Sequence, residues 1–192
     1  MNTHALIPLI ATVVYIPLFI ILLINRTWDK RQRFFFLFLI AAFLWSFTDI
    51  LFRSDYFMPH KLLLVKFVLC TAILMLIQFH YFFCSVYRPQ RVKIPLAYIF
   101  LLSTIALAVL GYIPRGVEIT PSGINVDYGI WIVAISLSFL FTTGAKDIYC
   151  LLQKYRISPN PAERNLFIYL LPWAFLLFFS SALLRPLEGD IR

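Results

Sequence analysis

Ionisable side chains inside apolar stretches are the residues of this sequence that could bind a ligand. Asp49 lies near the end of one such stretch, and Lys66 lies near the start of the next. Only a short connection separates the two stretches, so we expect both residues to lie at a similar depth and to pair. Arg53, four residues after Asp49, is a helical neighbour that can compete for the same carboxylate.

The ligand-binding hypothesis joins this pair to two tryptophans and comprises Asp49, Lys66, Trp45 and Trp131. Two structural alternatives stay open. The charges can form an ion pair without a ligand, or the lysine ammonium can reach the membrane surface along its apolar stem. The tryptophans can equally be interfacial residues, which are common in membrane proteins that bind nothing.

Gln78 and His80 form a candidate switch toward the other end of the stretch that contains Lys66. Imidazole changes its charge close to neutral pH, which suits it to sensing. The alternative is a hydrogen-bonded histidine that serves only in packing.

Motifs typical of catalysis are missing from the sequence, which has no phosphate-binding loop, no dinucleotide fingerprint, no HExxH and no GxSxG. The three cysteines, Cys70, Cys84 and Cys150, have no CxxC spacing and fall in or beside apolar stretches. We interpret them as packed thiols and not as a zinc site or a disulfide framework. We therefore expect no enzyme activity, no cofactor and no bound metal.

The composition points to a membrane protein. Of 192 residues, 61% are hydrophobic and 14% are charged, and the mean hydropathy is +0.85. An ordinary soluble domain is about 25% charged and about half apolar, so it could not bury this much apolar surface. The net charge of +8 lies mostly in short loops. We read it as a determinant of membrane orientation and expect no nucleic-acid partner.

A spanning helix needs ~20 mostly apolar residues, and six segments meet this length. We predict an all-α bundle that forms a single domain, residues 1–192. The predicted spans are Ala5–Ile24, Phe34–Phe52, Leu62–Cys84, Ile94–Ile113, Ile130–Ile148 and Leu166–Leu184.

Loop charges predict the orientation of these helices. Most Lys and Arg residues follow the first, third and fifth segments, whereas most Asp and Glu residues lie in the other loops. Because basic loops stay in the cytoplasm, both chain ends are expected on the outer side.

Two loops carry local signals. Val117–Thr120 and Ile124–Tyr128 are β-prone and flank Pro121-Ser122-Gly123, which predicts a small extracellular hairpin between the fourth and fifth helices. On the inner side, the fifth helix is expected to project beyond the lipid through Tyr155. Asn160 and Glu163 have the spacing of a helix cap, which predicts that the sixth helix begins inside the cytoplasm.

Four stretches, in order, resemble the N-terminal seven-helix sensor region of bacterial and archaeal histidine kinases and diguanylate cyclases. Trp45–Arg53 is similar to the second helix of that family, which carries a Trp and then an acidic residue. Phe79–Phe83 resembles the aromatic end of its third helix. Gly123–Gly129 resembles the loop before its fifth helix, and Leu152–Leu171 contains its Tyr-Arg, Ser and Glu-Arg-Asn pattern.

The resemblance implies a sensory receptor in the cytoplasmic (inner) membrane. Its partners would be membrane lipid, an extracellular or membrane-borne small-molecule or lipophilic ligand, and a cytoplasmic kinase or cyclase output module in cis or in trans. A homodimer is usual in that family. The signal would reach the output module through the fifth and sixth helices, with Tyr155, Arg156, Glu163 and Arg164 as relay residues.

The sequence departs from the family pattern after the sixth helix, because it ends at Arg192 without the seventh helix or an output domain. We expect either a fragment of a longer receptor or a stand-alone relative. Two other functions stay open. A scaffold or assembly subunit would bind no ligand, and a small transporter would need a continuous polar path or an inverted repeat.

Overall fold

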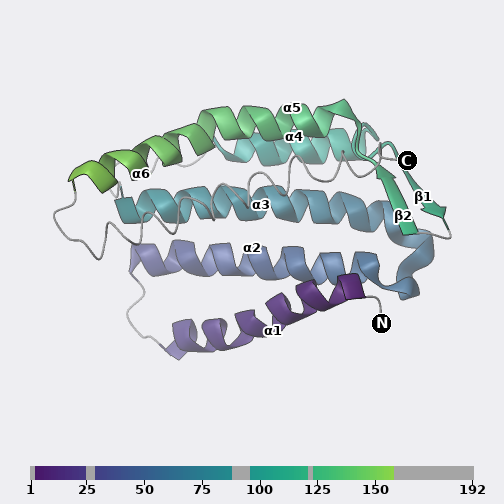
Figure 1. The fold of residues 1–192 in the computed structure, drawn as a ribbon, viewed down its shortest axis with the longest axis horizontal. Coiled ribbons are helices and arrows are strands. Elements are labelled where there is room, and N and C mark those ends of the chain that lie inside the picture. Colours follow the sequence, from purple (N-terminus) through teal and green to yellow (C-terminus); the bar gives the residue numbers. More distant parts are fainter. Residues whose placement is uncertain (1–2, 25–28, 88–95, 121–122, 158–192) are drawn as a thin grey trace. The chain divides into compact units, whose positions relative to one another are not determined.

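A computed structural model describes residues 3–24, 29–87, 96–120 and 123–157 of the chain. The chain divides into two compact units, Met1–Asp127 and Tyr128–Arg192. The elements in order are α1 (Thr3–Ile24), α2 (Lys30–Arg53), the 3-10 helix η1 (Asp55–His60), α3 (Lys61–Tyr87), α4 (Tyr98–Val109), β1 (Gly116–Thr120), β2 (Gly123–Asp127), α5 (Gly129–Phe139), the π-helix η3 (Leu140–Gly144) and α6 (Ala145–Ile157) (Figure 1).

Three helical segments are long and apolar enough to cross a membrane, namely Lys30–Arg53, Lys61–Val86 and Gly129–Cys150. Within α1 the segment Thr12–Ile24 is a shorter apolar stretch, and α4 (Tyr98–Val109) is a short apolar helix. These features confirm the prediction of a mostly helical chain with helices long and apolar enough to cross a membrane. Three of the six predicted spans thus have the required length among the described residues, and the predicted sixth span, Leu166–Leu184, lies outside them.

Local capping explains where α2 begins. The helix starts at Lys30, four residues earlier than predicted, because Asp29 forms a capping box. The backbone N–H of Lys30 donates to Asp29 Oδ1 at 2.7 Å, and the backbone N–H of Asp29 donates to Gln32 Oε1 at 3.3 Å. These bonds satisfy N–H groups that a helix start otherwise leaves unpaired. The basic residues that follow Asp29 are therefore helical.

A glycine ends α4 earlier than the predicted boundary at Ile113. Gly111 adopts a positive φ of 80°, which favours glycine because it has no Cβ. The N–H of Tyr112 donates to Leu107 O at 2.9 Å, and the N–H of Gly111 donates to Ala108 O at 3.3 Å. This pair of bonds is the Schellman motif that closes many helices. As a result, α4 is only 12 residues long.

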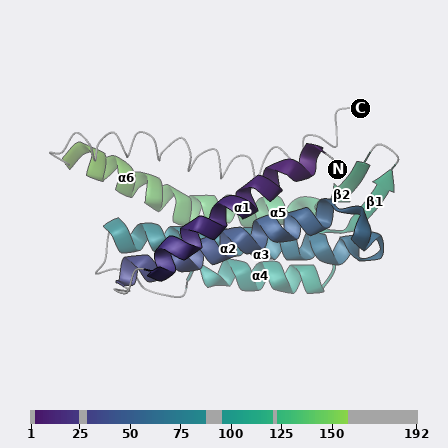
Figure 2. The same cartoon turned by 90° about the horizontal axis from the view of Figure 1, so that it is seen from below.

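The helices of the first unit pack in chain order, with α2 between α1 and α3 and with α4 on α3. Figure 2 shows α1 crossing α2 obliquely. The α2–α3 contact combines small residues with aromatic pairs. Ala41 and Ala42 are buried on α2, and the rings of Phe35 and Phe82 lie 5.1 Å apart. Small residues allow helices to approach closely in lipid, where packing drives association.

The predicted hairpin is confirmed. Strands β1 and β2 pair antiparallel, with Val117 opposite Val126 and Ile119 opposite Ile124. The N–H of Arg115 donates to Asp127 O at 2.8 Å and closes the open end of the hairpin. An isolated two-stranded hairpin is marginally stable in water. Here β1 contacts α3, which gives the hairpin the support that it needs.

In the described part of the second unit, residues 128–157, the elements α5, η3 and α6 follow one another without a break. The π-helical turn of Leu140–Gly144 was not predicted. Side-chain hydroxyls bond the carbonyls at this turn. Thr142 Oγ1 donates to Ser138 O, and Thr143 Oγ1 donates to Phe139 O, both at 2.6 Å. A π turn inside an α-helix is rare and frequently marks a functional position.

Candidate functional site

A buried carboxylate lies near the C-terminal end of α2. Asp49 is 5% exposed, and its Oδ2 accepts a hydrogen bond from Arg53 Nε at 2.9 Å. A charge inside an apolar segment is costly unless it is paired, so residues of this kind usually mark a functional site or a structural ion pair. Arg53 thus forms the ion pair with Asp49 that the sequence left open as an alternative to Lys66.

Lys61 is the cation that sequence reasoning missed. It is the first residue of α3 and is 2% exposed. Its Nζ donates to the backbone carbonyls of Phe52 and Ser54 and lies 5.5 Å from the centre of the Phe52 ring. The last carbonyls of a helix have no partner within the helix and carry partial negative charge, which suits an ammonium group. We call Asp49, Arg53 and Lys61 the α2-end cluster.

Lys66 does not take the predicted place beside Asp49. It is half-buried on α3 and forms no ion pair or hydrogen bond with any residue in the part of the chain that the structure describes. Trp45 is half-buried one turn before Asp49, whereas Trp131 is exposed on α5, in the other unit. A ligand-binding role for these residues remains a prediction.

A polar contact joins α3 to α4. Gln78, which is 5% exposed, donates through Nε2 to Tyr98 Oη at 2.6 Å. The ring of Tyr81 stacks on that of Tyr98, with the centroids 5.6 Å apart. Among the described residues, Gln78 Oε1 has no hydrogen-bond partner although it is buried. Gln78, one of the two candidate switch residues, therefore joins α3 to α4 together with Tyr81.

We expect Tyr98→Phe to lower the free energy of unfolding by about 1–2 kcal/mol, because it leaves the buried Gln78 amide without its bond to α4. Thermal unfolding in detergent would measure this loss. The double variant Gln78→Leu/Tyr98→Phe should recover part of it, since both ends of the bond are then apolar. A loss that is the same in both variants would show that the hydrogen bond does not hold α4 in place.

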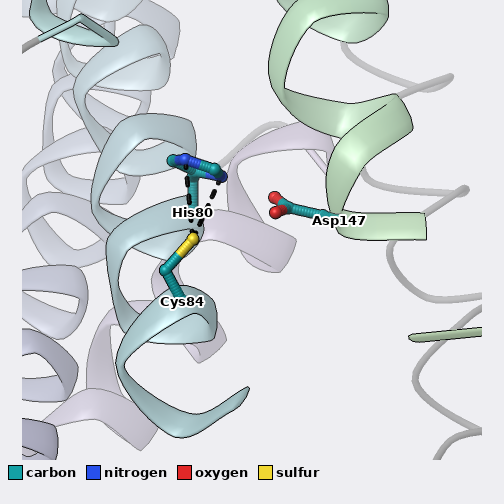
Figure 3. Close-up of side chains that lie close together, drawn as sticks. All are labelled: His80, Cys84 and Asp147. Atoms are coloured by element: carbon teal, nitrogen blue, oxygen red, sulfur yellow. Dashed lines mark hydrogen bonds between the residues drawn. The ribbon is translucent and has the colours of Figure 1, made fainter. Parts of the chain in front are cut away.

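His80, the other candidate switch residue, pairs with a cysteine. Figure 3 shows His80 and Cys84 one turn apart on α3, both half-buried. Cys84 Sγ lies 3.7 Å from His80 Nε2 and 3.9 Å from His80 Nδ1. Spacings between cysteines alone do not reveal this pair. The signal was present in the sequence as His-x-x-x-Cys within a helix, a spacing that places both side chains on one face.

The predicted relay residues lie at the end of the second unit. Arg156 is exposed on α6, and Tyr155 belongs to the same helix. The other two relay residues, Glu163 and Arg164, lie outside the described residues.

The fold and composition define a helical membrane protein with a charged cluster at one end of its first unit. Comparisons with known protein families, with curated proteins and with solved structures find no match to this chain.

Proposed function

We propose that this chain is the membrane-embedded sensory domain of a bacterial or archaeal signal-transduction protein of the histidine kinase type. It would detect an extracellular or membrane-borne ligand and pass helix movement to a cytoplasmic output module. The ordered set of resembling stretches supports this class. The cytoplasmic membrane and the orientation with the N-terminus outside belong to the same proposal, supported by the loop charges.

The observation that carries the proposal is the α2-end cluster. Its three charged residues lie at the end of α2 that the loop charges assign to the outer side. Arg53 bonds Asp49 through Nε, and its side chain is 32% exposed. The guanidinium group has five N–H donors in a planar fork, so the terminal nitrogens can still receive an anionic or hydrogen-bonding group. Asp49 would then hold the guanidinium group of Arg53 in position to bind a ligand.

The second unit offers a route for the signal. Its helical run continues for 29 residues, from Gly129 to Ile157, and the last turns carry polar residues beyond the apolar segment. At ~1.5 Å per residue this run is longer than the hydrocarbon core requires. A continuous helix transmits a shift or rotation along its axis, and the π turn is a place where such a helix can change its winding.

The test uses the purified chain in detergent, with fractions of spent growth medium and of cell lipid extract as probes. A ligand present at about 100 times its dissociation constant stabilises the folded state by ~2.7 kcal/mol. At least one fraction should therefore raise the unfolding temperature of the wild type. Asp49→Asn, which keeps the side-chain shape, should lose this rise. Arg33→Gln, a change at an exposed position on α2, should keep it.

Two results would contradict the proposal. If no fraction stabilises the wild type, the receptor assignment fails. If Asp49→Asn folds normally and responds like the wild type, the α2-end cluster is not the ligand site. Flux of the stabilising compound across proteoliposomes would instead indicate a transporter. A stable partner complex that carries no small molecule in native mass spectrometry would indicate a scaffold.

A further inference from the structure

We propose that His80 and Cys84 form a chelating site for a thiophilic d10 cation, with Zn²⁺ as its representative. This inference shares only the membrane orientation with the proposed sensory function, and it needs neither a sensory ligand nor an output module. It rests on the geometry of two donor side chains on one helix.

The separation of the donor atoms fits a shared metal ion. In tetrahedral zinc sites the Zn–S distance is ~2.3 Å and the Zn–N distance is ~2.0–2.1 Å, which places the sulfur and nitrogen about 3.6 Å apart. Cys84 Sγ lies 3.7 Å from His80 Nε2. Residues four apart on a helix lie on one face, one turn above the other. A single ion can therefore bind both donors once the imidazole ring rotates to direct one nitrogen at the ion, because Sγ now lies almost equally far from Nε2 and Nδ1.

The surroundings favour a soft cation over a hard one. Imidazole and thiolate are the ligands that zinc prefers, whereas magnesium and calcium prefer oxygen. Both side chains are half-buried, and their neighbours Tyr81 and Ser85 are buried. The donors are thus partly shielded from water, and ligands are still able to exchange. Water or further side chains would complete the coordination.

His80 and Cys84 lie near the C-terminal end of α3, so an ion can reach them from the solvent. Cys84 lies ~5 Å and His80 ~10 Å from the C-terminal end of the helix at Tyr87, at 1.5 Å per residue. The loop charges assign this end to the cytoplasmic side, where thiols stay reduced. Binding would convert the Cys84 thiol to a metal-bound thiolate and release one proton to the solvent, because only the thiolate coordinates.

The experiment measures alkylation of individual cysteines in the purified full chain by a maleimide, with and without Zn²⁺. Cys70 is the matched control, because it is half-buried on the same helix and has Lys66 and Leu74, not a histidine, one turn away on either side. We expect Zn²⁺ to slow alkylation of Cys84 roughly tenfold or more, since a coordinated thiolate is not free to react. Cys70 should react at the same rate in both conditions.

His80→Ala should abolish the protection of Cys84. A second measurement applies if that variant fails to fold. Cd²⁺ should produce a thiolate charge-transfer band in the ultraviolet spectrum of the wild type and of Cys70→Ser, and not of Cys84→Ser. Equal slowing of both cysteines, protection that survives in His80→Ala, or a Cd²⁺ band that survives in Cys84→Ser would overturn the proposal. The pair would then be a thiol–imidazole contact only.

Discussion

Replacing Lys61 with alanine is expected to lower the free energy of unfolding by about 2–4 kcal/mol. The ammonium group bonds the carbonyls of Phe52 and Ser54 at the end of α2, and the residue is almost completely buried. The variant removes hydrogen bonds from a charged donor, leaves two carbonyls without that donor and opens space where the stem packed. Unfolding in mixed micelles of increasing SDS content, followed by circular dichroism, would measure the loss.

Lys66→Ala is the matched control for that experiment. It removes the same side chain from the same helix, five residues later, where the lysine is half-buried and has no partner among the described residues. We expect its effect to stay within about 0.5 kcal/mol, as for most substitutions away from specific contacts. Comparable losses in the two variants would show that the contacts of Lys61 with the end of α2 contribute nothing specific.

Replacing Arg53 with methionine should lower the free energy of unfolding by about 2–4 kcal/mol, because it removes a cation that compensates the buried Asp49 carboxylate. The apolar stem of arginine is largely retained in methionine, so lost packing contributes little. Arg33→Met, which changes an exposed arginine at the other end of α2, should have a much smaller effect. The same titration with SDS measures both variants.

Combining Arg53→Met with Asp49→Asn tests the cause of that loss. If the destabilisation comes from an uncompensated carboxylate, the neutral amide should restore most of the lost stability. The double-mutant cycle then gives a coupling energy of about 1–3 kcal/mol. Additive losses would mean that Arg53 stabilises the fold through packing and not through the charge of Asp49.

Much of the fold follows from local signals. A mean hydropathy of +0.85 favours a membrane protein, and Pro121-Ser122-Gly123 between β-prone stretches predicts the hairpin that β1 and β2 form. Two boundaries were misjudged although their signals are local. Asp29 with Gln32 starts α2, and Gly111 ends α4. Hydropathy marks the apolar part of a helix, whereas capping bonds decide where it begins and ends.

The site could be predicted only in part, because spacing along the chain does not decide which groups meet across a turn. Asp49 and Arg53 are neighbours on one helix, so their pairing was an open alternative from the start. The sequence does not show which of Lys61 and Lys66 lies at the end of α2. That position depends on how η1 turns the chain, which brings Lys61 to the carbonyls that end α2.

Composition, the length of the apolar segments and the turn residues therefore indicated by themselves a helical membrane protein with a small hairpin. These properties arise from neighbouring residues and from the cost of burying polar groups in lipid. Only the tertiary structure decided which lysine is buried at the end of α2, and that Gln78 joins α3 to α4 through Tyr98. Those contacts arise between elements, and their geometry is set by packing.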